Sequence, residues 1–205
     1  MFPAKDNIPV DRPPVVTVAL IVANVVVFLV VGTAHPGSVT LGTTFGSMFR
    51  QTSVLQLLGN MWFLWLFGST IEDAMGPVRY LAFYVAGGLV ALGLTAAFDP
   101  DLAAPPAGAA GAVAAVLGGY LVLYPRARII ALSLIPFFSG VAEIPVPVLA
   151  VLWVAMQCAF AAAGFIGGGG VAYVSWIGGL AFGAAVARPL ATRRKPTPPT
   201  AAAFR

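Results

Sequence analysis

The side chains that could act as a nucleophile or a base in this chain are few and lie far apart. The only histidine, His35, falls in a loop, and Lys5 and Lys195 lie near the two ends. The candidate nucleophiles left without an embedded base are Ser139, Ser175 and Cys158. Metal-dependent hydrolysis would need ligands spaced as in HExxH, which the chain lacks. The sequence therefore predicts no metal, no cofactor and no conventional catalytic pair.

The composition is that of an integral membrane protein. Of 205 residues, 60% are hydrophobic and 9% charged, and the mean hydropathy is +0.94. Such a chain cannot cover a soluble core with a polar surface. A helix needs about 20 apolar residues to cross a hydrocarbon layer roughly 30 Å thick. Six apolar runs are placed at about 14–33, 54–72, 78–98, 108–124, 146–165 and 171–190.

The basic residues orient these spans, because Lys and Arg near span ends concentrate in cytoplasmic loops. With six spans, all but one of them fall on the face that holds both termini: Lys5, Arg12, Arg79, Arg126, Arg128, Arg188, Arg193, Arg194, Lys195 and Arg205. Arg50 falls on the other face. We therefore expect both termini in the cytoplasm.

This topology divides the chain into three segments. We expect a cytoplasmic N-terminal segment at 1–14, a membrane domain at 15–190 and a basic, disordered tail at 191–205. The net charge of +4 is spread over short juxtamembrane positions, which favours anionic lipid headgroups over nucleic acid as its partner. The Ala- and Pro-rich composition with short loops is compatible with a bacterial plasma membrane.

Two further features are expected at the cytoplasmic surface. The apolar piece from 129 to 143 contains Pro136 and Gly140 and is too short to cross, so we interpret it as an interfacial or re-entrant segment. Glu72 and Asp73 lie at a helix end near Arg79, where a structural ion pair or a helix cap is the natural interpretation.

Three ordered motifs give the chain a family resemblance. Residues 59–88 read GNMWFLWLFGSTIEDAMGPVRYLAFYVAGG, residues 108–112 read GAAGA, and residues 169–183 read GGVAYVSWIGGLAFG. Together they resemble the second, third, fourth and sixth helices of rhomboid intramembrane serine proteases. The resemblance implies an all-α membrane protein, a six-transmembrane-helix rhomboid-like bundle.

In that family a serine on the fourth helix attacks the peptide carbonyl and a histidine on the sixth helix removes its proton. The resemblance places these positions at Ala110 and Trp176, and neither side chain can do that chemistry. The family's second-span histidines align with Gln51 and Gln56, and its oxyanion-binding asparagine aligns with Asn60. Losing a nucleophile or its base typically costs on the order of a millionfold in rate.

Each of these residues has a plain structural alternative. Asn60 is either a remaining oxyanion donor or an interhelical hydrogen-bonding group, and Gln56 is either a polar contact or a binding group. Trp176 either fills the space left by the histidine or contacts client helices. Small residues that would let α-helices approach closely are Gly111, Gly118, Gly179 and Gly183.

The sequence therefore supports two hypotheses of function. The first is a pseudoprotease that binds or regulates other membrane proteins through their transmembrane segments. The alternative is a working intramembrane serine endopeptidase, as the rhomboid frame implies. Residues 110 and 176 favour the first. The expected partners are the lipid bilayer and the transmembrane segments of clients.

Overall fold

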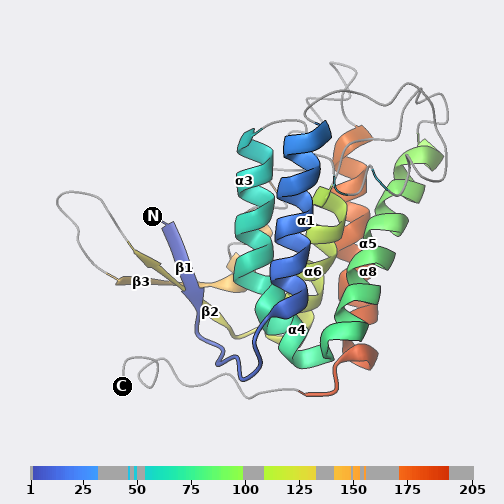
Figure 1. Ribbon diagram of the computed structural model, residues 1–205. Helices are drawn as coiled ribbons and strands as arrows, with labels where there is room; N and C mark the ends of the chain where they lie inside the picture. Colours follow the sequence, from blue (N-terminus) through green and yellow to red (C-terminus); the bar gives the residue numbers. More distant parts are fainter. Residues whose placement is uncertain are drawn as a thin grey trace.

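The computed structural model describes residues 2–31, 46, 49, 54–98, 109–132, 141–148, 150–152, 155 and 171–193. They form a helical bundle with a small sheet to one side (Figure 1). The helices are α1 (Val15–Val31), α3 (Val54–Phe63), η1 (Leu64–Gly68), α4 (Ser69–Met75), α5 (Pro77–Phe98), α6 (Ala109–Leu123) and α8 (Val171–Leu190). They cover every expected span except 146–165, most of which lies outside the described residues. The count of six spans stays a prediction.

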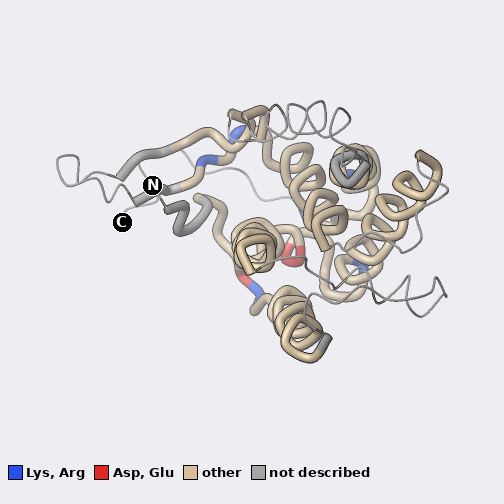
Figure 2. The backbone as a smooth tube through the Cα atoms, turned by 90° about the horizontal axis from the view of Figure 1, so that it is seen from above, with Lys and Arg blue, Asp and Glu red and all other residues tan. Residues whose placement is uncertain are grey.

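Two helical runs are long and apolar enough to cross a membrane by length and composition. One is Val54–Met75, in which the π-helical turn η1 continues α3 into α4, and the other is α5. Shorter apolar helices cover Val15–Val30 and Ala109–Leu123. Seen end-on in Figure 2, these helices have few charged positions along them. This pattern fits elements whose surroundings are lipid.

Local chemistry sets several helix ends. Pro13 and Pro14 precede α1, and Pro14 accepts a 3.0 Å hydrogen bond from the Val18 amide. Gly76 ends α4 with a φ of 82°, a backbone conformation that favours glycine, and donates a 2.7 Å hydrogen bond to the Glu72 carbonyl. Pro77 then begins α5. A tight turn at Gly76 and Pro77 thus joins α4 to α5.

Helix α6 is the central element of the bundle. Every residue from 111 to 120 is buried, so the helix is enclosed around its whole circumference. It packs against both α5 and α8, and α3 contacts it from a further side. Positions on this helix are therefore surrounded by protein rather than by lipid.

The structure is mostly helical, as predicted, and adds a small sheet that the prediction of an all-α fold did not include. Strands β1 (Phe2–Asp6), β2 (Arg128–Leu132) and β3 (Val141–Pro145) pair antiparallel in the order β1-β2-β3. The register pairs Phe2 with Leu132 and Ile130 with Glu143. The described parts of the expected interfacial or re-entrant segment, and part of the N-terminal segment, are thus strands.

The physical reason lies in composition and place. Ile129, Ile130, Val141 and Ile144 are β-branched, and short apolar runs of this kind suit a strand as well as a helix. Pro3 cannot donate a ladder hydrogen bond, and it lies on an edge strand, where that is tolerated. An open sheet needs hydrated edges, so it belongs outside the hydrocarbon layer.

Candidate functional site

The interface between α6 and α8 is formed by backbone in close approach. A Cβ added to Gly179 would overlap the carbonyl oxygen of Gly111, and one added to Gly183 would overlap that of Ala115. A Cβ on Gly118 would overlap the carbonyl oxygen of Leu180 from the opposite direction. Only glycine allows this separation, because any side chain would meet backbone that cannot rotate away.

The resemblance-derived catalytic positions lie at one end of this interface. Ala110 is half-buried and packs against the core, next to Gly111. Trp176 is 6% exposed and belongs to the same core, one residue after Ser175. The Ser175 hydroxyl lies 3.0 Å from the point where a Gly111 Cβ would stand. The neighbours of residues 110 and 176 are therefore in direct contact across the two helices.

Helix α5 closes the same region from a third side. A Cβ on Gly111 would also overlap the Ala91 Cβ, and one on Gly87 would overlap that of Ala115. Farther along the helices, the Phe83 and Phe182 rings stack with their centroids 5.9 Å apart. Helices α5, α6 and α8 thus meet with little space between them.

The remaining family positions lie on or before α3. Asn60 and Gln56 are both half-buried, and each has an interaction partner. Asn60 lies between the buried Leu57 and Met61 on a helix that packs against α6. Gln51 lies outside the described residues. Within the part of the chain that is described, no group of three or more His, Cys, Asp or Glu residues could hold a metal ion.

A polar cluster lies where α4 meets the start of α1. In it, Glu72 binds a helix start that the sequence did not reveal. The Glu72 carboxylate, 4% exposed, accepts hydrogen bonds from the Val16 and Thr17 amides, each at 2.8 Å. It also accepts one from the Thr17 hydroxyl at 2.7 Å. The sequence predicted an ion pair or a cap at Glu72, and the structure shows a cap. The sequence did not identify the helix that is capped, α1, whose Thr17 lies 55 residues before Glu72.

This cap completes the hydrogen bonding of the α1 N-terminus. The first four amides of a helix lack partners inside it. Here Val15 and Val18 donate to the carbonyls of Pro13 and Pro14, while Val16 and Thr17 donate to Glu72. The available sequence signal was that proline, which has no side-chain acceptor, occupies the usual capping position. A distant acceptor was therefore required.

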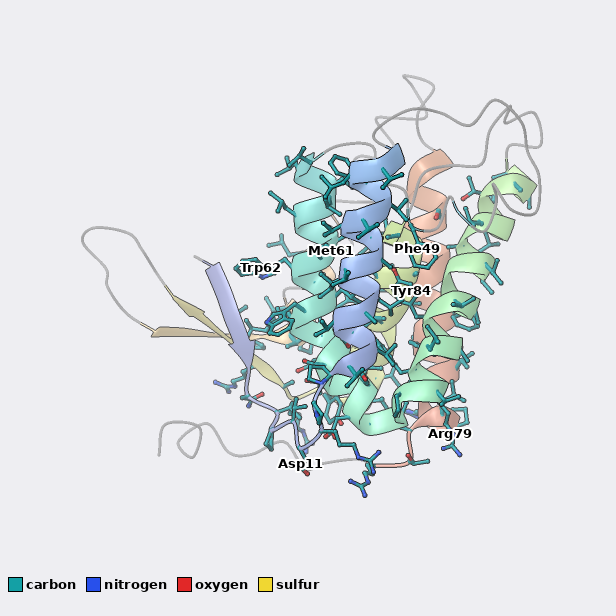
Figure 3. The ribbon with its side chains drawn as sticks, in the orientation of Figure 1. Asp11, Phe49, Met61, Trp62, Arg79 and Tyr84 are labelled. Carbon is teal, nitrogen blue, oxygen red and sulfur yellow. The ribbon has the colours of Figure 1, made fainter. Side chains whose placement is uncertain are left out.

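Buried polar groups continue beside this cap. The Tyr80 hydroxyl and the Thr17 side chain both lie against Gly68 in η1, where a Cβ would meet them. Farther along α1, the fully buried Asn24 donates to the Leu20 carbonyl at 2.8 Å. Figure 3 shows Tyr84 pointing into the bundle from α5. The π-helical turn thus coincides with a close approach between α1, η1 and α5.

The chain segments flanking the bundle join the same end. The amides of Thr192 and Arg193 donate to the Ala74 carbonyl at 2.9 and 3.0 Å. The Asp11 amide lies 3.5 Å from the Asp73 carboxylate. Figure 3 shows Asp11 and Arg79 at this end of the bundle. The last turn of α4 therefore anchors residues from both ends of the described chain; most of the predicted tail, 191–205, lies beyond them.

These helices and their glycine-mediated packing define a membrane protein with a tightly closed central helix. The comparison with known families gives the class a name. Residues 38–193 match the Rhomboid domain, and the chain belongs to the rhomboid family. The family assignment made from the three motifs is confirmed.

Similar curated proteins match only part of their length. Presenilin-associated rhomboid-like protein A, mitochondrial, from Danio rerio is 32% identical over 98 residues, covering 46% of this chain and 26% of the relative. The human presenilin-associated rhomboid-like protein, mitochondrial, is 27% identical over 110 residues, covering 52% and 29%. Rhomboid protein 1, mitochondrial, from Saccharomyces cerevisiae is 32% identical over 89 residues, covering 42% and 26%. The chain thus spans little more than a quarter of these relatives' length.

Proposed function

We propose that this rhomboid-family membrane protein is a non-catalytic binder or regulator of other membrane proteins. The observation that supports this most is the contact between the neighbours of Ala110 and Trp176 across α6 and α8. Peptide hydrolysis needs a nucleophile, a base and room for a peptide and water at one point. Alanine and indole provide neither group, and Gly111 and Gly179 bring the backbones together at this level.

The proposed client surface is the lipid-facing side of α3. Its exposed apolar residues include Leu55, Leu58 and Trp62, and the surface continues onto η1 with Trp65. A groove of about 390 Å³ between α1 and α3 is lined by Ile21, Leu58, Met61, Trp62 and Trp65. Trp65, 55% exposed, lies near the middle of the Val54–Met75 run, whereas tryptophan usually prefers the ends of a span. A transmembrane segment of another protein would cover this indole.

The proposal includes a topology with both termini in the cytoplasm. Arg12, Arg79, Arg126 and Arg193 flank the ends of α1, α5, α6 and α8 that meet near Glu72 and Ala74. Gathering at one end is what the positive-inside tendency predicts for a cytoplasmic face. The membrane we propose is a bacterial plasma membrane, for which the support is the composition; the relatives' names place those relatives in mitochondria.

Catalysis is tested with the full chain in liposomes containing a transmembrane substrate whose helix is destabilised. An active serine rhomboid in the same liposomes is the positive control. We expect no cleavage above the protein-free background, because residues 110 and 176 provide neither nucleophile nor base. Turnover that disappears in Ser175→Ala, the serine beside Trp176, would show that the chain is a protease and would overturn the proposal.

Client binding is tested by site-specific photo-crosslinking in native membranes. A crosslinking residue replaces Trp65 in η1, directly after α3, and the matched control replaces Leu89, 45% exposed on α5. We expect discrete protein adducts from position 65 and lipid adducts alone from position 89. Equal adduct patterns at the two positions would show that α3 has no preferred partner.

A further inference from the structure

An apolar cavity of about 520 Å³ lies between α6, α8 and the residues that follow β3. Its size falls within the range of roughly 300–1,000 Å³ typical of small-molecule sites. Every described lining residue is apolar, and the lining includes Leu121, Pro125, Pro147, Ala150, Val151 and Leu180. Neither the rhomboid chemistry nor the client surface on α3 uses this cavity.

The lining determines what can fill the space. The space is open on one side, since Val151 in its lining is 68% exposed, and its apolar lining offers water no hydrogen-bond partners. Leaving such a space empty costs packing energy. Because the surroundings of this bundle are lipid, the apolar group available at high concentration is an acyl chain.

An exposed arginine lies next in sequence to one of the residues that line the cavity. Pro125, which lines the cavity, lies in the turn after α6, where the Ala127 amide donates to the Tyr124 carbonyl at 3.0 Å. The Val146 amide then donates to the Ala127 carbonyl at 3.0 Å. This bond holds the residues that follow β3, which form the other wall of the cavity, against this turn. Arg126, between Pro125 and Ala127, is exposed. Arg126 thus directly follows a lining residue and is accessible to a lipid headgroup, and arginine is well suited to bind phosphate.

We propose that this cavity binds one anionic phospholipid, with an acyl chain between α6 and Ala150 and the phosphate on Arg126. The combination of an apolar lining and an exposed arginine next to a lining residue matches a lipid better than a client helix. This site is separate from the α3 surface and does not depend on the absence of proteolysis.

The headgroup contact is tested by native mass spectrometry of the full chain in detergent. Phosphatidylglycerol and phosphatidylcholine with the same acyl chains are titrated in turn. We expect a one-to-one phosphatidylglycerol adduct, and Arg126→Gln should weaken it about fivefold, as expected for one basic residue at a membrane surface. Arg79→Gln, at an exposed arginine that begins α5, is the control and should leave it unchanged. Equal losses in both variants, or equal affinity for the two lipids, would overturn the phosphate contact.

The acyl-chain contact is tested by filling the cavity. Ala150 is 4% exposed and lines it, so Ala150→Leu should abolish the adduct, whereas Ala82→Leu on the exposed face of α5 should retain it. Leu180→Phe enlarges a second lining side chain and serves if Ala150→Leu does not fold. Adducts that persist in the folded filling variant, or a co-purifying protein that competes with the lipid, would show that the cavity is not the lipid site.

Discussion

Helices α8 and α1 are joined to the bundle in opposite ways. The α6–α8 interface uses backbone against backbone, with Gly179 and Gly183 facing carbonyl oxygens of α6. Helix α1 instead has its first turn bound by the Glu72 carboxylate, while Val18, Val22 and Val26 remain exposed. Helices in lipid gain little from the hydrophobic effect on associating, so close packing and polar contacts must hold them. The α6–α8 interface relies mainly on close packing, and the attachment of α1 relies mainly on polar contacts.

The difference has a consequence for motion. A backbone interface has no side-chain freedom, so we expect α6 and α8 to move together as one unit. A helix held at one end by a carboxylate can move at its other end without breaking that contact. We therefore expect α1, beside the proposed α3 client surface, to be the more mobile wall of the α1–α3 groove.

The glycine interface is broken most directly by Gly183→Ala. The added methyl group would overlap the Ala115 carbonyl oxygen, which cannot move without displacing α6. Overpacking a core costs roughly 1–3 kcal/mol, and we expect about 3 kcal/mol here because the obstacle is backbone. Thermal unfolding in detergent measures the loss.

Gly93→Ala on α5 is the matched control. A Cβ at that position would meet nothing within 4 Å. Helix propensity alone would then stabilise the variant by up to about 1 kcal/mol. If the two variants unfold at the same temperature, the close approach of α6 and α8 does not govern stability.

The polar attachment is broken by Glu72→Ala, with a smaller expected effect of about 2 kcal/mol. The variant removes the acceptor of two amides and a hydroxyl, and hydrogen bonds to a charged group contribute roughly 1.5–3 kcal/mol. Hydrogen exchange should rise at Val16 and Thr17 in the first turn of α1 and stay unchanged in α6. Faster exchange throughout the bundle would mean that Glu72 supports the whole fold rather than α1.

The helices could be predicted from the sequence because a span of about 20 apolar residues is a one-dimensional signal. Small residues at Gly111, Gly118, Gly179 and Gly183 were likewise visible without coordinates, since few other roles suit glycine inside a span. The sheet could not be predicted. Its strands β1 and β2 are more than 100 residues apart, and a five-residue apolar run does not distinguish strand from helix.

The candidate site could likewise be predicted from the sequence only in part. Residue types at 110 and 176 could be read directly, and the proposal of a non-catalytic protein rests on them. The contact between Ser175 and Gly111 depends on the rotation of α6 and α8 about their axes. Both helices are apolar on nearly every side, so their sequences do not specify which side faces the partner. The Glu72 cap was hidden for another reason: a carboxylate can bind any helix start that the fold brings near it.

The smallest predicted effect separates the two parts of the α1 cap. Thr17→Val replaces the hydroxyl by a methyl group of similar size at a fully buried position. It removes one 2.7 Å hydrogen bond to Glu72 and leaves the two amide bonds in place. We expect a loss of about 1 kcal/mol, measured by thermal unfolding beside Glu72→Ala. The double variant should cost no more than Glu72→Ala alone, because the hydroxyl would have lost its acceptor already. Additive losses would instead assign the stabilising role of Thr17 to its contacts with Tyr80 and Gly68.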